Sequence, residues 1–272
     1  MSNDLLRGVR VVSVAQNVPG PLAVARLVSR GASATKIEPL SGDPFAPLCQ
    51  SWYDEMHRGV SVERLDLKSA EGRGRLVALL RAADLFITSH RPSALARLRL
   101  DPESLRGEVP GVRIIRVVGS LADPEEAGHD LTYQAHAGLA RETMPLTLAA
   151  DVMASERVYA TALELLRGPG GACVDIGLIE SLDPLRAPLR HGLTAPGGVL
   201  GGGVPRYRIY ATRDGHVALA ALEGHFERRF YEVLGLPIGS DPSAEFLQRT
   251  AVEWVEWARS NDVPLTSIRG GG

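Results

Sequence analysis

The sequence lacks several features that would point directly to a function. Its 30 basic and 32 acidic residues leave a formal net charge of −2, so we expect no strongly basic surface for nucleic acid. Only two cysteines occur, Cys49 and Cys173, and they form no metal-binding or redox spacing. No apolar run approaches the ~18 residues that span a bilayer. The first ten residues do not resemble a signal peptide, so we expect a cytoplasmic protein without metal or membrane contact.

The composition is that of an ordinary globular protein. Of the 272 residues, 44% are hydrophobic and 23% are charged, whereas disorder requires low hydrophobicity and high net charge. A chain of this length forms one large domain or two modest ones.

Strand-like and helix-like segments alternate in the first half of the chain. The β-branched run 8–14 predicts a buried strand, a proline-containing loop leads into a helix over 22–29, and 34–38 predicts a second strand. Further strands are expected within 60–67 and at 85–88 and 112–118, with helices over 70–82, capped by Ser69, and 92–98. This alternation predicts an α/β fold with an open parallel, Rossmann-like sheet. No G-x-G-x-x-G follows the first strand, which argues against a dinucleotide cofactor.

The second half has a different pattern. The glycine-rich segment 191–203 is expected to be a linker between a large domain, 1–190, and a small α+β domain, 204–240. The small domain should contain a hairpin, with strands at 206–210 and 216–220 around Arg213-Asp214-Gly215, followed by a helix over 225–234. A last helix over 244–260, within a segment 241–272, is expected to return to the large domain.

Several segments resemble one protein family in their order along the chain. They include GVRVVSVAQNVPGPLAVARLVSRGASATKIEPLSGDP at 8–44, RPSALARLRLDPESL at 91–105, GHDLTYQAHAGLA at 128–140 and VPRYRIYATRDGHVALAALEGHF at 204–226. Together they are similar to the family III CoA-transferases, the group that includes α-methylacyl-CoA racemase. The resemblance implies a large α/β domain, a smaller domain and a homodimer of interlocked rings. It also implies an acyl-CoA substrate, with no cofactor beyond the coenzyme A that the substrate carries.

The segment GHDLTY at 128–133 separates the branches of this family, because the transferases usually carry tyrosine where this chain has His129. The resemblance implies that His129 is a catalytic base, that Asp151 is its partner on the opposite face of the substrate, and that Glu223 orients the histidine. Residues 152–155 replace the family's small glycines after the aspartate, and the interval between His129 and Asp151 is short. A structural histidine, a helix-capping aspartate and a solvated glutamate are the alternatives.

The resemblance also implies a set of residues that bind the coenzyme. Cations suit its phosphates, and open α/β sheets bind ligands at the carboxyl ends of their strands. The residues expected to contact coenzyme A are Asn17, Val18, Lys36, Arg58, Arg91, Gly128, Asp130 and Tyr133.

Three functions remain open. In the first, two bases remove and return the α-proton of a 2-methylacyl-CoA thioester and so epimerise the α-carbon. In the second, Asp151 is a nucleophile that transfers coenzyme A between carboxylic acids through an anhydride and a thioester. In the third, the chain is a non-catalytic CoA-binding paralogue, because several loops are short and 119–126 lacks the family's glycine-rich loop.

Overall fold

The computed structural model describes residues 4–268 and divides the chain into two compact units between Pro184 and Leu185. Each unit has a hydrophobic core of its own. Within the described residues, no helix combines the length and the apolar character needed to cross a membrane.

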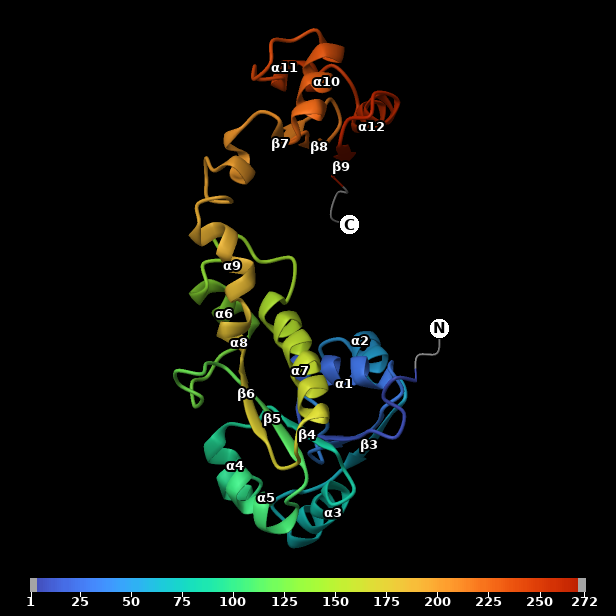
Figure 1. The fold of residues 1–272 in the computed structure, drawn as a ribbon, viewed down its shortest axis with the longest axis vertical. Helices are drawn as coiled ribbons and strands as arrows, with labels where there is room; N and C mark the ends of the chain where they lie inside the picture. The colour runs from blue at the N-terminus through green and yellow to red at the C-terminus, as the bar shows by residue number, and fades with distance from the viewer. Residues whose placement is uncertain (1–3, 269–272) are drawn as a thin grey trace. The chain divides into compact units, whose positions relative to one another are not determined.

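A parallel sheet forms the centre of the first unit (Figure 1). Its order is β3-β2-β1-β4-β5-β6, and every neighbouring pair is parallel. The strands are β1 (Arg10–Ser13), β2 (Ser33–Glu38), β3 (Val60–Arg64), β4 (Leu85–Thr88), β5 (Arg113–Val118) and β6 (Cys173–Gly177). This order reverses direction between β1 and β4, the point at which doubly wound sheets bind ligands. The expected α/β fold with an open parallel sheet is confirmed.

Helices cover both faces of this sheet (Figure 1). Helices α1 (Pro19–Val28) and α7 (Ala149–Arg167) lie on one face, and α3 (Ala70–Leu80), α4 (Pro92–Leu98) and α5 (Pro102–Glu108) lie on the other. Side chains alternate along a strand, so Val11 enters the core beneath α1 and α7 while Val12 enters the core beneath α3 and α4. As expected, Ser69 caps α3, since its Oγ accepts the Gly72 N–H at 3.0 Å.

Four short helices of the first unit were not expected from the sequence. They are α2 (Gln50–Met56), α5, α6 (Asp130–His136) and α8 (Leu178–Ser181). Helix α2 packs its Met56 against Val18 and Phe45 beside the start of α1. Helix α6 follows the loop after β5, and the site described below is built around it.

The second unit is a small antiparallel sheet with helices. After α9 (Asp183–Arg190) and the turn η1 (Val199–Gly203), strands β7 (Tyr207–Ala211), β8 (His216–Ala220) and β9 (Leu265–Ser267) pair in that order. The expected hairpin is β7–β8. Helices α10 (Gly224–Leu234), α11 (Ser243–Phe246) and α12 (Ala251–Ser260) complete the unit.

The single helix expected over 244–260 is wrong, because the chain forms two helices there. Thr250 starts a new helix: its Oγ1 accepts the Glu253 N–H at 3.2 Å, and the Glu253 carboxylate accepts the Thr250 N–H at 2.7 Å. Trp254 of α12 is buried in the core of the second unit, and β9 pairs with β8. Residues 269–272 of the expected C-terminal segment lie outside the described residues.

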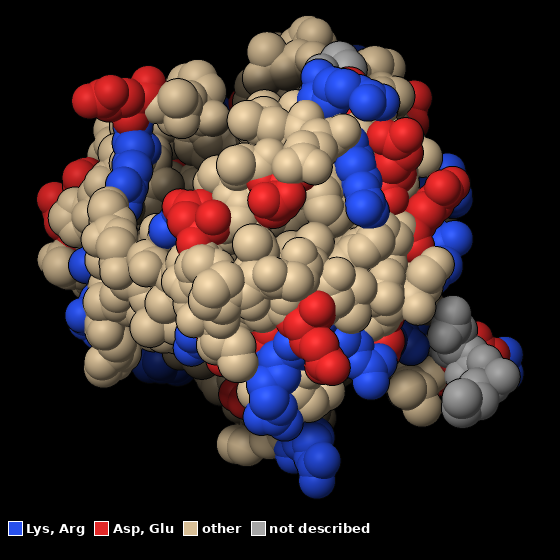
Figure 2. Space-filling model, turned by 90° about the horizontal axis from the view of Figure 1, so that it is seen from above, with Lys and Arg blue, Asp and Glu red and all other residues tan. Residues whose placement is uncertain are grey.

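Charges of both signs are interspersed on the molecular surface. On the face in Figure 2, lysine and arginine side chains alternate with aspartate and glutamate, and the described residues form no large patch of one sign there.

Candidate active site

A pocket of about 170 Å³ lies at the carboxyl ends of β1, β4 and β5 in the first unit. The segments that follow these strands form its walls, together with the start of α6 and the first turn of α7. The pocket brings together most of the residues expected at the site: Asn17, Arg91, Gly128, His129, Asp130, Tyr133 and Asp151. The two expected bases of the first unit, His129 and Asp151, therefore share one cavity.

His129 stands immediately before α6 and is exposed. Its backbone is fixed by Thr132, whose hydroxyl accepts the His129 N–H at 3.1 Å and donates to the His129 carbonyl at 2.8 Å. The imidazole is thus carried on a rigid backbone at the rim of the pocket, where it can meet a ligand.

Asp151 is the third residue of α7 and is half-buried. Burial is the larger cause, and the charge of Asp130 the smaller, of a rise in the pKa of Asp151 from 3.8 to about 7. The alternative that Asp151 caps its helix is wrong, because Leu148 occupies the N-cap position. A carboxyl group with a pKa near neutrality can both accept and release a proton at physiological pH.

Asp130 holds the first turn of α7 in place. It is 5% exposed, and its Oδ1 accepts the N–H of Ala150 at 2.7 Å and of Asp151 at 3.1 Å. Its Oδ2 accepts from Gln134 Nε2 at 2.5 Å, and Gln134 also donates to the Thr147 carbonyl at 2.8 Å. The carboxylate of Asp130 thus caps α7 and positions Asp151, while its expected contact with coenzyme A stays a prediction.

Gly128 and Tyr133 shape the floor of the pocket by packing on each other. A Cβ at Gly128 would lie 2.5 Å from Tyr133 Cε1, and one at Gly119 would lie 2.6 Å from the Tyr133 hydroxyl oxygen. The tyrosine ring therefore requires glycine at both positions. Burial is the main cause of a raised Tyr133 pKa, to which Glu126 and Asp151 contribute.

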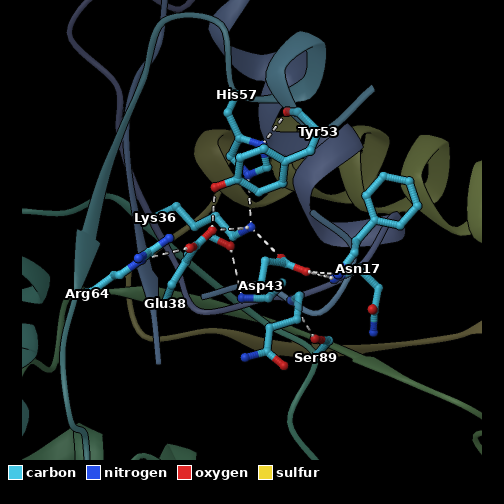
Figure 3. A network of polar contacts seen from close by, with 12 residues as sticks. Asn17, Lys36, Glu38, Asp43, Tyr53, His57, Arg64 and Ser89 are labelled. Carbon is cyan, nitrogen blue, oxygen red and sulfur yellow. Dashed lines mark hydrogen bonds and ion pairs between the residues drawn. The ribbon is translucent and has the colours of Figure 1, made fainter. Parts of the chain in front are cut away.

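Three residues expected to bind coenzyme A lie outside this pocket. Lys36 is 2% exposed, and its ammonium is bonded to Glu38, Asp43 and His57, which leaves it no surface for a phosphate (Figure 3). Val18 is buried with Phe45 and Met56. Arg58 is exposed in the turn after α2 and has no side-chain partner among residues 4–268.

Glu223 belongs to the second unit, where it is exposed at the N-cap position of α10. Its expected hydrogen bond to His129 stays a prediction.

A groove that the sequence analysis did not identify lies on the other side of the switch point. One cavity of about 410 Å³ and another of about 600 Å³ share Leu67, Lys68, His90 and Leu98. The first also contains Gln16, which lines the active-site pocket as well, and the second contains Arg73, Arg97 and Arg99. One feature of the sequence could have indicated this groove. Lys68 follows the segment that forms β3, and parallel sheets bind ligands at the edge where their strands end.

The loop 119–128 over the pocket is pinned at two points. Glu180 Oε1 accepts the Leu121 N–H at 2.9 Å, and the Glu125 carboxylate accepts from the N–H of Ser93 at 2.6 Å and from its hydroxyl at 2.9 Å. These bonds fix a loop that differs from the glycine-rich loop that the resemblance implied. Within residues 4–268, no group of three or more histidines, cysteines or acids could hold a metal ion.

Comparisons with known proteins identify the family of this chain. Residues 6–270 match CoA-transferase family III. The chain is 25% identical to the CaiB/baiF CoA-transferase family protein ZK892.4 of Caenorhabditis elegans, over 97% of this chain and 85% of that protein. It is 29% identical to the alpha-methylacyl-CoA racemase of Mus musculus, over 93% of this chain and 69% of the racemase. Human succinyl-CoA:glutarate CoA-transferase is 23% identical, over 85% and 60% respectively.

The fold is also that of a solved structure. The crystal structure of the hypothetical protein Rv3272 from Mycobacterium tuberculosis has a TM-score of 0.82 at 21% identity, covering 97% of this chain and 85% of that one. Of these relatives, one is a racemase of an acyl-CoA and one is a CoA-transferase. By the match along nearly its whole length, the chain belongs to CoA-transferase family III.

Proposed function

We propose that this protein exchanges the α-proton of an acyl-CoA thioester and so epimerises a 2-methylacyl-CoA, with His129 and Asp151 as its two bases. The observation that carries the proposal is their presence in one pocket, combined with a pKa of about 7 for Asp151. A base of near-neutral pKa suits the removal of a weakly acidic proton at physiological pH, since both of its protonation states are populated.

The proton balance of the reaction is simple. In one direction ionised Asp151 takes the α-proton, the electron pair of the C–H bond moves into the thioester as an enolate, and protonated His129 gives a proton to the opposite face. In the reverse direction the two residues exchange roles. Asp130 positions Asp151 throughout, because it holds the backbone of the α7 first turn. Positioning of this kind matters, since an error of about 1 Å can cost on the order of 100-fold in rate.

The groove beside the pocket supports the acyl-CoA substrate. Its apolar wall offers a slot for a purine ring, and Lys68 and Arg97 offer charges for phosphates. Gln16 lines both the groove and the active-site pocket. We place the nucleotide of the substrate in the groove and its thioester in the pocket.

Coenzyme A transfer between carboxylic acids is the second candidate, favoured by the similarity to transferases. Here Asp151 would attack the thioester as a carboxylate and form an acyl anhydride, releasing the thiolate of coenzyme A. A pKa of about 7 leaves a large fraction of Asp151 protonated at neutral pH and so weakens it as a nucleophile. A binding protein without catalysis is the third candidate.

One incubation separates these candidates. The protein is mixed in D₂O with a single enantiomer of a 2-methylacyl-CoA and, separately, with an acyl-CoA plus a free carboxylate. Deuterium at the α-carbon with loss of optical purity supports epimerisation. Movement of coenzyme A to the carboxylate without α-exchange supports transfer instead. Inactivity in both assays would support the third candidate, a binding protein without catalysis.

Variants assign the roles. His129→Ala and Asp151→Asn should each abolish epimerisation, and Glu223→Gln should reduce it less, because the glutamate would only orient the histidine. Full epimerisation by Asp151→Asn, with an inactive His129→Ala, would refute the two-base assignment.

We also propose that the protein is a homodimer, so light scattering that gives a mass near the 29.1 kDa of one chain would contradict that proposal.

A further inference from the structure

A buried network of charged residues extends to Asn17, which lines the candidate active site (Figure 3). Lys36, in β2, is at its centre, and its ammonium has three partners: Glu38 Oε1 at 3.1 Å, Asp43 Oδ2 at 2.5 Å and His57 Nε2 at 2.9 Å. Lys36 and Glu38 are 2% and 1% exposed, and Asp43 is 3% exposed. The three donors of the lysine are thereby used completely.

The lysine fixes the protonation of its histidine partner. Because the ammonium has only donors, His57 Nε2 must accept, and Nδ1–H then donates to the Tyr53 carbonyl at 2.6 Å. Burial is the main cause of a lowered His57 pKa, and the charge of Lys36 adds to it. The Tyr53 hydroxyl donates to Glu38 at 2.7 Å. The network therefore joins β2 to α2 in one defined arrangement.

Asp43 connects this network to the pocket. Its Oδ2 faces the lysine, while its Oδ1 accepts the N–H of Asn17 at 3.1 Å and of Phe45 at 2.9 Å. Asn17 has a φ of 63°, a left-handed conformation that asparagine tolerates better than most residues. It lines the pocket that contains His129 and Asp151. In Figure 3 its side chain points away from the network.

The neighbouring residue is held in the same manner. The N–H of Gln16 donates to the Ser89 hydroxyl at 3.0 Å, which ties the carboxyl end of β1 to that of β4. Two successive backbone amides at the switch point are thus bound by side chains from other segments of the chain. Stability alone gives no reason for charged groups here, since a buried ion pair is often no more stabilising than apolar residues of similar volume.

We propose that Asp43, held by Lys36, is a positioning residue that fixes Asn17 in the wall of the active-site pocket and so sets where the thioester lies against His129 and Asp151. This inference rests on the proposed function. Lys36, on this proposal, acts on the substrate only through Asp43 and Asn17, and its expected contact with a phosphate is replaced by this role.

The test compares two variants that each remove one carboxylate partner of Lys36. Asp43→Ala also releases the Asn17 amide, whereas Glu38→Gln does not touch Asn17. We expect Asp43→Ala to lower kcat for α-proton exchange at least about tenfold with KM changed less than about threefold, as expected for misplacement of a bound substrate. Glu38→Gln should stay within about threefold of the wild type in both constants. Equal loss of kcat in the two variants would overturn the proposal, because it would show a general effect of the network.

A double-variant cycle and an activity-independent measurement complete the test. Asn17→Gly keeps the left-handed turn but removes the side chain, so it should lower kcat, and adding Asp43→Ala should lower kcat no further. Amide hydrogen exchange at Asn17 should be slow in the wild type and fast in Asp43→Ala. A rapidly exchanging Asn17 amide in the wild type would refute the proposal even if Asp43→Ala fails to fold. A wild type inactive in both reactions would refute the proposed function alone.

Discussion

The raised pKa of Asp151 means that ionising this proposed base lowers the free energy of unfolding, and this loss can be measured. The folded protein holds the Asp151 proton up to a pKa of about 7, while the unfolded chain releases it near 3.8. For an acid with a raised folded pKa, the contribution to stability is complete below the unfolded pKa and is lost as the pH rises through the folded pKa. Wild-type stability should therefore fall between about pH 4 and about pH 7 through this one group.

The magnitude follows from the shift. A difference of about 3 pH units corresponds to about 4 kcal/mol, and partial solvent access to the half-buried side chain reduces this to about 2–4 kcal/mol. The side chain of Asp151→Asn carries no charge at any pH, so the variant does not lose stability as the pH rises from about 4 to about 7. We expect the variant to match the wild type near pH 4 and to exceed its free energy of unfolding by about 2–4 kcal/mol near pH 8.

The assay is native-state hydrogen exchange with denaturant, read at the strands of the first unit so that the second unit does not contribute. The measurement near pH 4 is the internal control for any change in packing that the substitution itself causes. If the difference in unfolding free energy between the variant and the wild type is the same near pH 4 and near pH 8, the raised pKa of Asp151 is refuted.

Three further outcomes are expected. Lys36→Met should destabilise the first unit by about 3–5 kcal/mol in chemical denaturation, because it removes the buried cation that Glu38 and Asp43 share and leaves Glu38 only Arg64, at 3.8 Å; a loss below about 1 kcal/mol would contradict the ion network. Gly128→Ala should lower stability by about 1–3 kcal/mol by overpacking on Tyr133, and combining it with Tyr133→Ala should remove most of that loss. Lys68→Ala should raise KM for acyl-CoA by about tenfold with kcat unchanged, and the effect should shrink at high salt; an unchanged KM would remove the groove from the substrate path.

The elements predicted most accurately from the sequence are those with strong local signals. The apolar run Leu85–Thr88 and the helix that begins at Pro92 have the expected bounds. Helix α2 was missed because the apolar spacing in QSWYDEM, from Trp52 to Met56, extends over only one turn, and its position depends on the packing of Met56 with Val18 and Phe45. The helix expected over 244–260 was too long because the capping pair Thr250 and Glu253 restarts it.

The candidate site divides in the same way. His129 could be identified from the short segment GHDLTY alone. Its place in one pocket with Asp151 follows from the order of the strands in the sheet. The bonding of Lys36 could not be predicted, since its partners Asp43 and His57 come from a loop and a helix that folding brings to it. The sequence predicted Asp130 in the correct pocket. Its bond to the start of α7 could not be predicted, because it spans 20 residues of sequence and no local pattern indicates it.

The carboxylate of Asp130 also determines which part of the chain is free to vary. Asp151 is located by two hydrogen bonds from its own turn to Asp130 of α6, and Gln134 of α6 also holds the Thr147 carbonyl just before that turn. We therefore expect that the stretch from about 138 to 146 can gain or lose residues while the two proposed bases keep their places. The short interval between His129 and Asp151 then falls in a stretch that does not line the pocket, and it leaves the two proposed bases where they were. We therefore expect the length of this stretch to differ between relatives whose pocket residues stay in register.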